Sequence, residues 1–233
     1  MKKRRLNWGQ GARVVICTSV LGLVPLARAA TEEDPWERIN RPVFSFNDTV
    51  DTYAFKPLAQ SYQFVTPTVV QTGIHNFLSN IGDVKNLTNN LLQGKLHSAG
   101  VDTGRLLMNS TIGLVGLVDV ATPMGLKRND EDFGQTLGHW GVGSGPYVVL
   151  PLMGPSTLRD APARYIDTYA APYSYMDDIR TRNALYGATL LDGRSQMLKA
   201  GKPVTGDKYV FVRNAYLQGR EFKIKDGRVE DDF

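Results

Sequence analysis

Apolar residues recur at intervals of three and four along much of the chain, the spacing that places them on one face of an α-helix. One such stripe, which we expect to be buried, follows Thr66-Pro67 and comprises Val70, Ile74, Phe77, Leu78 and Ile81. Upstream, Asp34-Pro35-Trp36-Glu37 combines an N-cap residue, a proline at the first helical position and an acidic residue three positions after the cap. The pattern predicts a mostly all-α protein.

One apolar stretch lacks a broad polar face. From Ile112 to Leu126 most side chains are apolar, but Gly113, Gly116 and Asp119 recur at every third residue. We expect a helix from Ile112 to Ala121, about 15 Å long, which is roughly half the thickness of a hydrocarbon core. It is either a core helix whose glycines allow close packing, or a helix embedded in one leaflet with Asp119 facing protein or a wet channel. In the second case the embedded side chains include Ile112, Leu114, Val115, Leu117 and Val118.

Glycine and proline are frequent between Phe133 and Asp160, which disfavours a long helix there. Gly141, Gly143 and Gly145 alternate ahead of Pro146, and residues 147–150 form a brief extended-looking run. We expect an ordered loop or a short hairpin. The glycine spacing matches neither the dinucleotide fingerprint nor the P-loop, so it does not indicate a nucleotide. A further small hairpin is expected at the Asp-Gly pair within residues 225–228.

The N-terminus has the three parts of an export signal. Four basic residues at positions 2–5 precede an apolar stretch from Val14 to Pro25, and Ala27-Arg28-Ala29 has small residues at minus three and minus one. The apolar stretch is shorter than the roughly 20 residues that span a bilayer, so cleavage is favoured over a retained anchor. We expect residues 1–29 to be a signal peptide and residues 30–233 to form a single domain.

Removal of the signal changes both the charge and the cysteine content. Positions 1–29 contain six of the 27 Lys and Arg residues and none of the 23 Asp and Glu residues, so the net charge falls from +4 to −2. A nucleic-acid partner, which requires clustered basic residues, is not indicated. Cys17 is the only cysteine, and the β-branched Ile16 before it matches a lipoprotein signal poorly. We expect an unlipidated mature chain without disulfides or thiolate metal sites.

Candidate catalytic groups are few. The three histidines lack the spacing of a helical zinc site: His75, His97 and His139. Ser144 is not at the centre of Gly-x-Ser-x-Gly, and the adjacent Asp177-Asp178 would not face each other on a helix. We expect no enzyme activity, cofactor or metal. The alternatives are a periplasmic hydrolase acting on lipid or cell-wall material, and a structural interaction module that uses the tyrosine-rich segment 165–175.

Several separated motifs resemble those of the MlaA (VacJ) family, in the same order and over essentially the whole mature chain. The signature residues are Asp34, Pro35, Asn40, Arg41, Phe46, Asn47, Gly134, Leu137, Gly138, Arg159 and Asp160. The resemblance implies a ring of amphipathic helices, with short irregular or hairpin segments, lying in the periplasmic leaflet of a Gram-negative outer membrane beside a porin trimer. Family members are usually lipidated at a cysteine, a pattern from which Ile16-Cys17 departs.

The resemblance also implies a function. Phospholipid mislocalised to the outer leaflet would pass through an amphipathic channel in the ring to a periplasmic lipid carrier protein, and lipid asymmetry would be maintained. On that basis Gly141, Gly143, Gly145 and Pro146 are either a gating element on the lipid path or a fixed turn that requires positive φ angles. A porin-associated structural module without transport is the remaining alternative.

Overall fold

The computed structural model describes residues 34–201 and 206–228. The expected signal peptide, residues 1–29 with Cys17, lies outside the described residues. The unit that begins at Pro35 is built mostly of helices, which confirms the mostly all-α prediction.

The first helical stretch consists of α2 (Glu37–Val50), a π-helical turn η1 (Asp51–Phe55) and α3 (Lys56–Val65). The regular part of α2 has its N-cap at Trp36. The N–H groups of Ile39 and Asn40 donate to the Trp36 carbonyl, so the regular helix begins two residues after Pro35, where the capping box predicts its start. The helix starts later than its sequence signal.

The next two helices, α4 (Thr68–Leu92) and α5 (Leu96–Thr111), pack on each other along their length. α4 begins directly after Thr66-Pro67, as expected. The helix expected from Ile112 to Ala121 is absent. Leu114, Val115 and Gly116 have φ values of 53°, 59° and 91°, and a right-handed helix cannot pass through left-handed backbone.

The glycine- and proline-rich segment contains α6 (Phe133–His139) and an antiparallel hairpin of β1 (Tyr147–Leu150) and β2 (Gly154–Thr157). The register pairs Tyr147 with Thr157 and Leu150 with Gly154. The hairpin agrees with the expected short hairpin. The short helix α6 differs from that expectation, and Asp132 begins it by accepting the Gln135 N–H.

The remaining elements are α7 (Asp160–Tyr169), the 3₁₀ turn η2 (Pro172–Tyr175), α8 (Ile179–Ala200) and α9 (Lys208–Ile224). The hairpin expected at residues 225–228 is wrong. Asp226 and Gly227 do have positive φ values, but they end α9, and the Gly227 N–H donates to the Phe222 carbonyl over 2.9 Å. An Asp-Gly pair fits a helix end as well as a hairpin turn.

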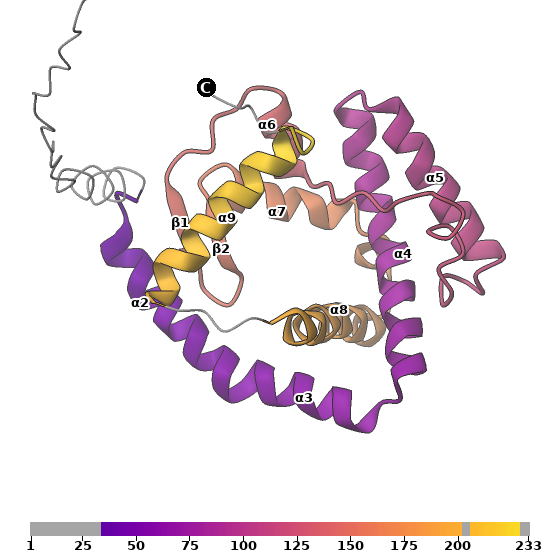
Figure 1. Cartoon of the computed structure of the whole chain (residues 1–233), viewed down its shortest axis with the longest axis horizontal. Coiled ribbons are helices and arrows are strands. Elements are labelled where there is room, and N and C mark those ends of the chain that lie inside the picture. The colour runs from indigo at the N-terminus through magenta and orange to yellow at the C-terminus, as the bar shows by residue number, and fades with distance from the viewer. Residues whose placement is uncertain (1–33, 202–205, 229–233) are drawn as a thin grey trace, which may run out of the picture. The chain divides into compact units, whose positions relative to one another are not determined.

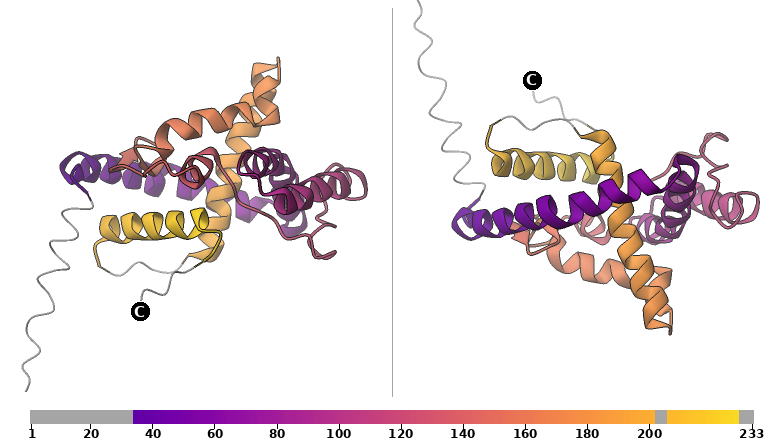
Figure 2. Two further views of the ribbon diagram at one scale, coloured as in Figure 1. Left: turned by 90° about the horizontal axis from the view of Figure 1, so that it is seen from above. Right: turned by 90° about the horizontal axis from the view of Figure 1, so that it is seen from below.

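Contacts between elements close a circuit. α2 packs on β1, α3 on α8, α4 on α6 and α8, and α9 on α6 and β2. Helices that are distant in sequence therefore follow one another around a ring (Figure 1). α8 is seen end-on in Figure 1 and lengthwise in Figure 2, so its axis crosses the plane of that ring. α7 and α9 lie on opposite sides of the layer that contains α2 and α3 (Figure 2).

Polar side chains fill most of the buried positions. Among the described residues, 22 buried side chains are polar or charged and seven are hydrophobic, of which four are alanine. Thirty-five large hydrophobic side chains are exposed, among them Phe64 (91%), Val69 (84%) and Tyr53 (80%). Water-soluble proteins rarely bury charges in such numbers or expose so much contiguous apolar surface. The surface is therefore suited to an apolar surrounding.

α4 shows this inversion along a single helix. Its buried residues are Gln71, Asn80, Asp83, Asn86, Asn89 and Asn90. Val70, part of the stripe expected to be buried, is exposed, and Ile74, Phe77, Leu78 and Ile81 are only half-buried. The spacing of three and four predicts the helix correctly and its buried face wrongly, because periodicity does not tell which face meets water and which meets lipid.

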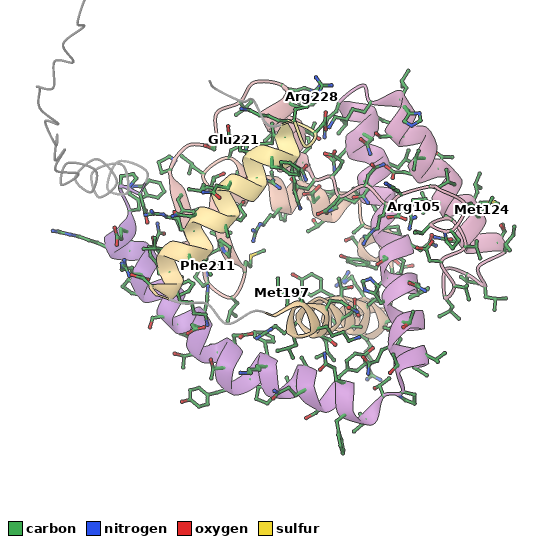
Figure 3. All side chains as sticks on the ribbon, in the orientation of Figure 1. Arg105, Met124, Met197, Phe211, Glu221 and Arg228 are labelled. Atoms are coloured by element: carbon green, nitrogen blue, oxygen red, sulfur yellow. The ribbon has the colours of Figure 1, made fainter. Side chains whose placement is uncertain are left out.

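The buried charges of α4 and α5 are compensated by a network. Asp83 is fully buried and accepts from Arg105 Nε at 3.0 Å and from Arg128 Nε at 2.9 Å. Asp102, also fully buried, accepts from Asn90 at 2.7 Å and Asn129 at 2.8 Å. Figure 3 shows Arg105 between α4 and α5, with Met124 at the outer edge. Buried charge is tolerated only when it is paired in this way.

Candidate functional site

Two cavities share a wall beside α4 and α7. The larger, about 460 Å³, also touches α8 and has a mixed lining that includes His75, Leu78, Ile81, Lys85, Arg128, Asp130, Met153, Arg164, Asp167, Tyr173, Tyr186 and Asp192. The smaller, about 390 Å³, is largely apolar and is lined by Val84, Thr88, Asn89, Leu92, Phe133, Ile166, Asp167, Tyr169, Ala170, Pro172 and Tyr175. Because Asp167 belongs to both, a charged chamber adjoins an apolar one.

Most charges of the larger cavity are paired. Arg128 is held by Asp83, Asp130 pairs with Lys223, and His75 Nδ1 lies 2.8 Å from Asp192 Oδ2. The remaining cations of this wall are Lys85 and Arg164. Neither has a carboxylate within ion-pair distance among the residues that the structure describes. The cavity therefore presents two cations that form no ion pair among the described residues, although the charge of Lys85 acts on Asp130, Asp132 and Asp167.

These two cations are held differently. Arg164 donates to the carbonyls of Met153 at 2.8 Å and Pro155 at 2.5 Å, at the tip of the β hairpin. Lys85 is the only Lys or Arg of α4 and is half-buried. Asp167 accepts from Asn89 Nδ2 at 3.2 Å and from the Phe133 N–H at 3.0 Å. Burial raises the pKa of Asp167, and the charge of Lys85 lowers it in part.

The apolar segment 112–118 is an exposed loop. Its side chains Ile112, Leu114, Val115, Leu117 and Val118 are between 47% and 68% exposed. Asn109 replaces the helical hydrogen bonds, because its Oδ1 accepts the N–H groups of Val120 and Ala121 and its carbonyl accepts that of Gly116. The predicted helix is therefore wrong, while the same side chains do face outward. Their embedding in a leaflet stays a prediction.

The residues expected to form a small polar face do turn toward protein, although no helix aligns them. Gly113 and Gly116 are buried, and a Cβ at Gly116 would lie 2.8 Å from Asn80 Nδ2. Asp119 accepts from Asn109 at 3.1 Å and from Thr122, and lies 3.6 Å from Arg105. Asp119 thus fastens the loop to α5. No helix among the described residues combines the length and apolar character needed to cross a membrane.

Two signature asparagines fasten α2 to the β hairpin. Asn40 donates to the Tyr147 carbonyl at 3.0 Å and accepts the Val149 N–H at 2.9 Å. Asn47, two turns further along the helix, donates to the Leu150 carbonyl at 2.9 Å and accepts the Leu152 N–H at 2.7 Å. An amide side chain can bond both groups of a strand at once, which explains why these positions are Asn.

The other N-terminal signature residues also serve the scaffold. Arg41 bonds Glu37 and Asp207 and lies 4.6 Å above the Tyr209 ring, so it ties α2 to the start of α9. Asp34 is buried, Pro35 is exposed, and Phe46 is 53% exposed on the outer surface. None of these residues lines either cavity.

The signature residues of the second block form a junction of α6, α7 and α9. Asp160, fully buried, accepts from Arg159 at 2.8 Å, from Arg220 at 2.8 Å and from Tyr216 at 2.9 Å. Burial acts to raise the pKa of Asp160, but these donors outweigh it and the pKa is lowered. A Cβ at Gly134 would lie 2.6 Å from Asp160 Oδ1, and one at Gly138 would lie 2.7 Å from Ile224 Cδ1. Leu137 is half-buried beside them.

The glycine loop after α6 is anchored at several points. Arg159 donates to the Val142 carbonyl at 3.1 Å, and the Leu158 N–H donates to the Pro146 carbonyl at 3.0 Å. Gly141 and Gly145 have φ values of 87° and 65°, whereas Gly143 has no positive φ and open space around it. The loop lines neither cavity. Only two of the three glycines are thus required by backbone geometry.

The histidines and the aspartate pair considered as catalytic candidates do not form a common site among the described residues. His97 and His139 do not line either cavity, and Asp178 is the N-cap of α8, where it accepts the Thr181 N–H at 2.9 Å. Within residues 34–201 and 206–228, no cluster of His, Cys, Asp or Glu is placed to hold a metal ion.

The cavity residues Lys85, Arg164 and Asp167 are not among the residues predicted from the sequence. For Lys85 a signal exists in the sequence, because it is the one Lys or Arg in a 25-residue helix that contains a single acidic residue, Asp83. Arg164 and Asp167 carry no such signal, since their position in the cavity depends on how α7 meets α4.

Comparison with known proteins identifies similar chains. Residues 32–223 match the family model described as MlaA lipoprotein. The Intermembrane phospholipid transport system lipoprotein MlaA of Escherichia coli (strain K12) is 32% identical over 221 residues, which cover 89% of this chain and 86% of that protein. The protein of the same name from Haemophilus influenzae is 29% identical over 230 residues, 92% of each chain. A solved structure described as "Structural basis for maintenance of bacterial outer membrane lipid asymmetry" matches with a TM-score of 0.72 and 34% identity, over 82% of this chain and 98% of that one.

Proposed function

Since the chain belongs to the MlaA lipoprotein family, we propose that it removes mislocalised phospholipid from the outer leaflet of a Gram-negative outer membrane and passes it to a periplasmic carrier protein. Lipid asymmetry is maintained as a result. The observation that carries the proposal is the inverted distribution of side chains: 35 large hydrophobic residues are exposed, while most of the buried side chains are polar or charged. Such a ring suits hydrocarbon outside and a head group inside.

The energetics of lipid extraction favour an enclosed path. Exposing two acyl chains to water costs about 0.8 kcal/mol per CH₂, or on the order of tens of kcal/mol for a phospholipid. The charged cavity and the apolar cavity meet at Asp167. The first suits a lipid head group, and the second suits acyl chains. No chemical change in the lipid is needed for this role.

The proposed location is the periplasmic face of the outer membrane. The exposed residues of α3 and of the loop 112–118 supply apolar surface for one leaflet, with Phe64 and Val65 at 91% and 72% exposure. We propose a porin trimer as the neighbour that covers part of this surface, in line with the family resemblance. Interfaces of this kind are enriched in exposed aromatic residues.

Purified protein should bind phospholipid and release it unchanged. The test is to incubate the protein with phospholipid in detergent and to analyse the extracted lipid by mass spectrometry. Intact phospholipid is the expected product. Accumulation of lysophospholipid or free fatty acid in proportion to protein would instead establish the hydrolase alternative.

The mature protein is expected to begin near Ala30 and to carry no acyl chain. The reason is the good cleavage motif Ala27-Arg28-Ala29 and the β-branched residue before Cys17. Intact-mass analysis of protein from the membrane fraction checks this. A diacylated or triacylated N-terminal cysteine would show that the chain follows the lipidated pattern of its family.

We also propose that the glycine loop gates the lipid path, and Gly143 is the residue that tests it. A Val at Gly143 meets open space and needs no positive φ, so Gly143→Val should leave abundance unchanged and restrict only the motion of the loop. Outer-leaflet phospholipid should rise, or the barrier to detergents should fail.

Gly141→Val is the matched control for this experiment. Its φ of 87° makes Val cost roughly 1–2 kcal/mol through backbone strain, so abundance and function should fall together. A Gly143→Val protein of normal abundance with wild-type lipid asymmetry would leave the loop as a fixed turn.

A further inference from the structure

The geometry points to a binding site for a zwitterionic phospholipid head group in the larger cavity, in which Lys85 and Arg164 bind the phosphate and Asp167 binds the ammonium. This inference rests on the proposed function, because it assigns the head group of the lipid that the ring handles. It goes beyond that function by naming the residues that select the lipid.

The two cations suit a phosphate because no carboxylate among the described residues lies within ion-pair distance of either. Arg164 is oriented by two carbonyls, those of Met153 and Pro155, which accept hydrogen bonds without neutralising its charge. Lys85 adds an ammonium from a second element of the cavity wall, α4. An oriented guanidinium together with a Lys ammonium is a common arrangement for binding phosphate.

Asp167 makes the site suited to a zwitterion. Its hydrogen-bond donors, Asn89 and the Phe133 N–H, are both neutral. Burial raises the pKa of this carboxyl, and Lys85 is the foremost group that lowers it. A phosphate bound to Lys85 would offset that cation and leave Asp167 with a negative neighbour. A head group that brings its own ammonium restores the balance, whereas a glycerol head group does not.

The position of Asp167 also orients the lipid. Asp167 lines both cavities. The ammonium and phosphate would therefore lie in the charged cavity, while the start of an acyl chain enters the apolar one. Val84, Ile166 and Phe133 supply the apolar wall there. The fit to both chambers distinguishes a phospholipid from free phosphate, which has nothing to place in the smaller cavity.

The experiment measures binding by the full purified chain in a non-ionic detergent. The probes are phosphatidylethanolamine, phosphatidylglycerol and diacylglycerol with identical acyl chains, and inorganic phosphate as competitor. The variants are Lys85→Met, Arg164→Met and Asp167→Asn. Asn retains one acceptor oxygen for the Phe133 N–H. Lys127→Met is the matched control, since Lys127 is exposed and lines neither cavity. Thermal melts of each variant establish that it is folded.

Wild-type protein is expected to bind phosphatidylethanolamine about tenfold or more tightly than the other two lipids, the factor that one charge-assisted hydrogen bond supplies. Lys85→Met should lose about tenfold in affinity for both phospholipids, and Lys127→Met should lose nothing. Asp167→Asn should bring phosphatidylethanolamine and phosphatidylglycerol to equal affinity. If Arg164→Met fails to fold, the Lys85 and Asp167 variants decide the question.

The inference is overturned if Lys85→Met binds like wild type, if Asp167→Asn keeps the preference, or if inorganic phosphate competes as strongly as lipid. In each of these cases wild-type protein still binds phospholipid, and the proposed function stands. If wild-type protein binds no phospholipid at all, the proposed function itself fails, so the two failures are distinguishable.

Discussion

Arg105→Met is expected to prevent accumulation of folded protein. Arg105 is 2% exposed and bonds Asp83, which has no exposed surface. Removing one partner of a buried pair leaves an uncompensated charge and typically costs about 3–5 kcal/mol, a large part of the roughly 5–15 kcal/mol that stabilises a native domain. Arg128, the other partner of Asp83, is largely exposed and compensates only in part.

The measurement is the abundance and melting temperature of the variant in detergent, with Arg180→Met as the control at an exposed position of α8. Adding Asp83→Asn to Arg105→Met should recover part of the loss, because the uncompensated charge is removed. A melting temperature for Arg105→Met equal to that of the control would mean that the polar interior does not hold the ring together.

Replacing both Leu114 and Val115 with Asp should release the protein from the outer membrane. Each charge placed in the hydrocarbon region costs roughly 2.5–3.5 kcal/mol, and the two side chains are 64% and 68% exposed at the end of the loop. Both residues have positive φ values of 53° and 59°, which Asp tolerates better than Leu or Val. Backbone strain therefore cannot explain a loss.

Fractionation of membranes and periplasm checks this result. Lys127→Asp is the control, because Lys127 lies in the same connection between α5 and α6. This change alters the net charge by the same amount as the double variant and removes no apolar side chain. A folded double variant that fractionates with the outer membrane like wild type would contradict the embedding of the loop 112–118.

The sequence predicts the helical class because a period of three and four is local information. It does not predict the buried face of α4, since Asn80, Asp83 and Asn86 have the same period as the apolar residues between them. In water the apolar face would be inside, and only the surrounding medium reverses that choice. The membrane location is expected from the family resemblance, because amino-acid composition alone does not indicate it.

The helix predicted over residues 112–121 is absent for a different reason. Its apolar residues carry no strong turn signal, and the turn depends on Asn109, which bonds the N–H groups of Val120 and Ala121. A single polar side chain thus outweighs the local preference for helix. The signature residues Asn40, Asn47 and Asp160 were recognisable from sequence, but their bonds to the hairpin and to Arg220 join positions far apart in the chain.

A role in lipid asymmetry can be tested in the bacterium that makes this protein, by measuring the phospholipid content of the outer leaflet after deletion of the gene and after complementation. If the protein maintains lipid asymmetry, outer-leaflet phospholipid rises on deletion and returns to the wild-type level when the intact gene is supplied. Phospholipid that stays at the wild-type level in the deletion strain, with the porins unchanged, would contradict a role in lipid asymmetry.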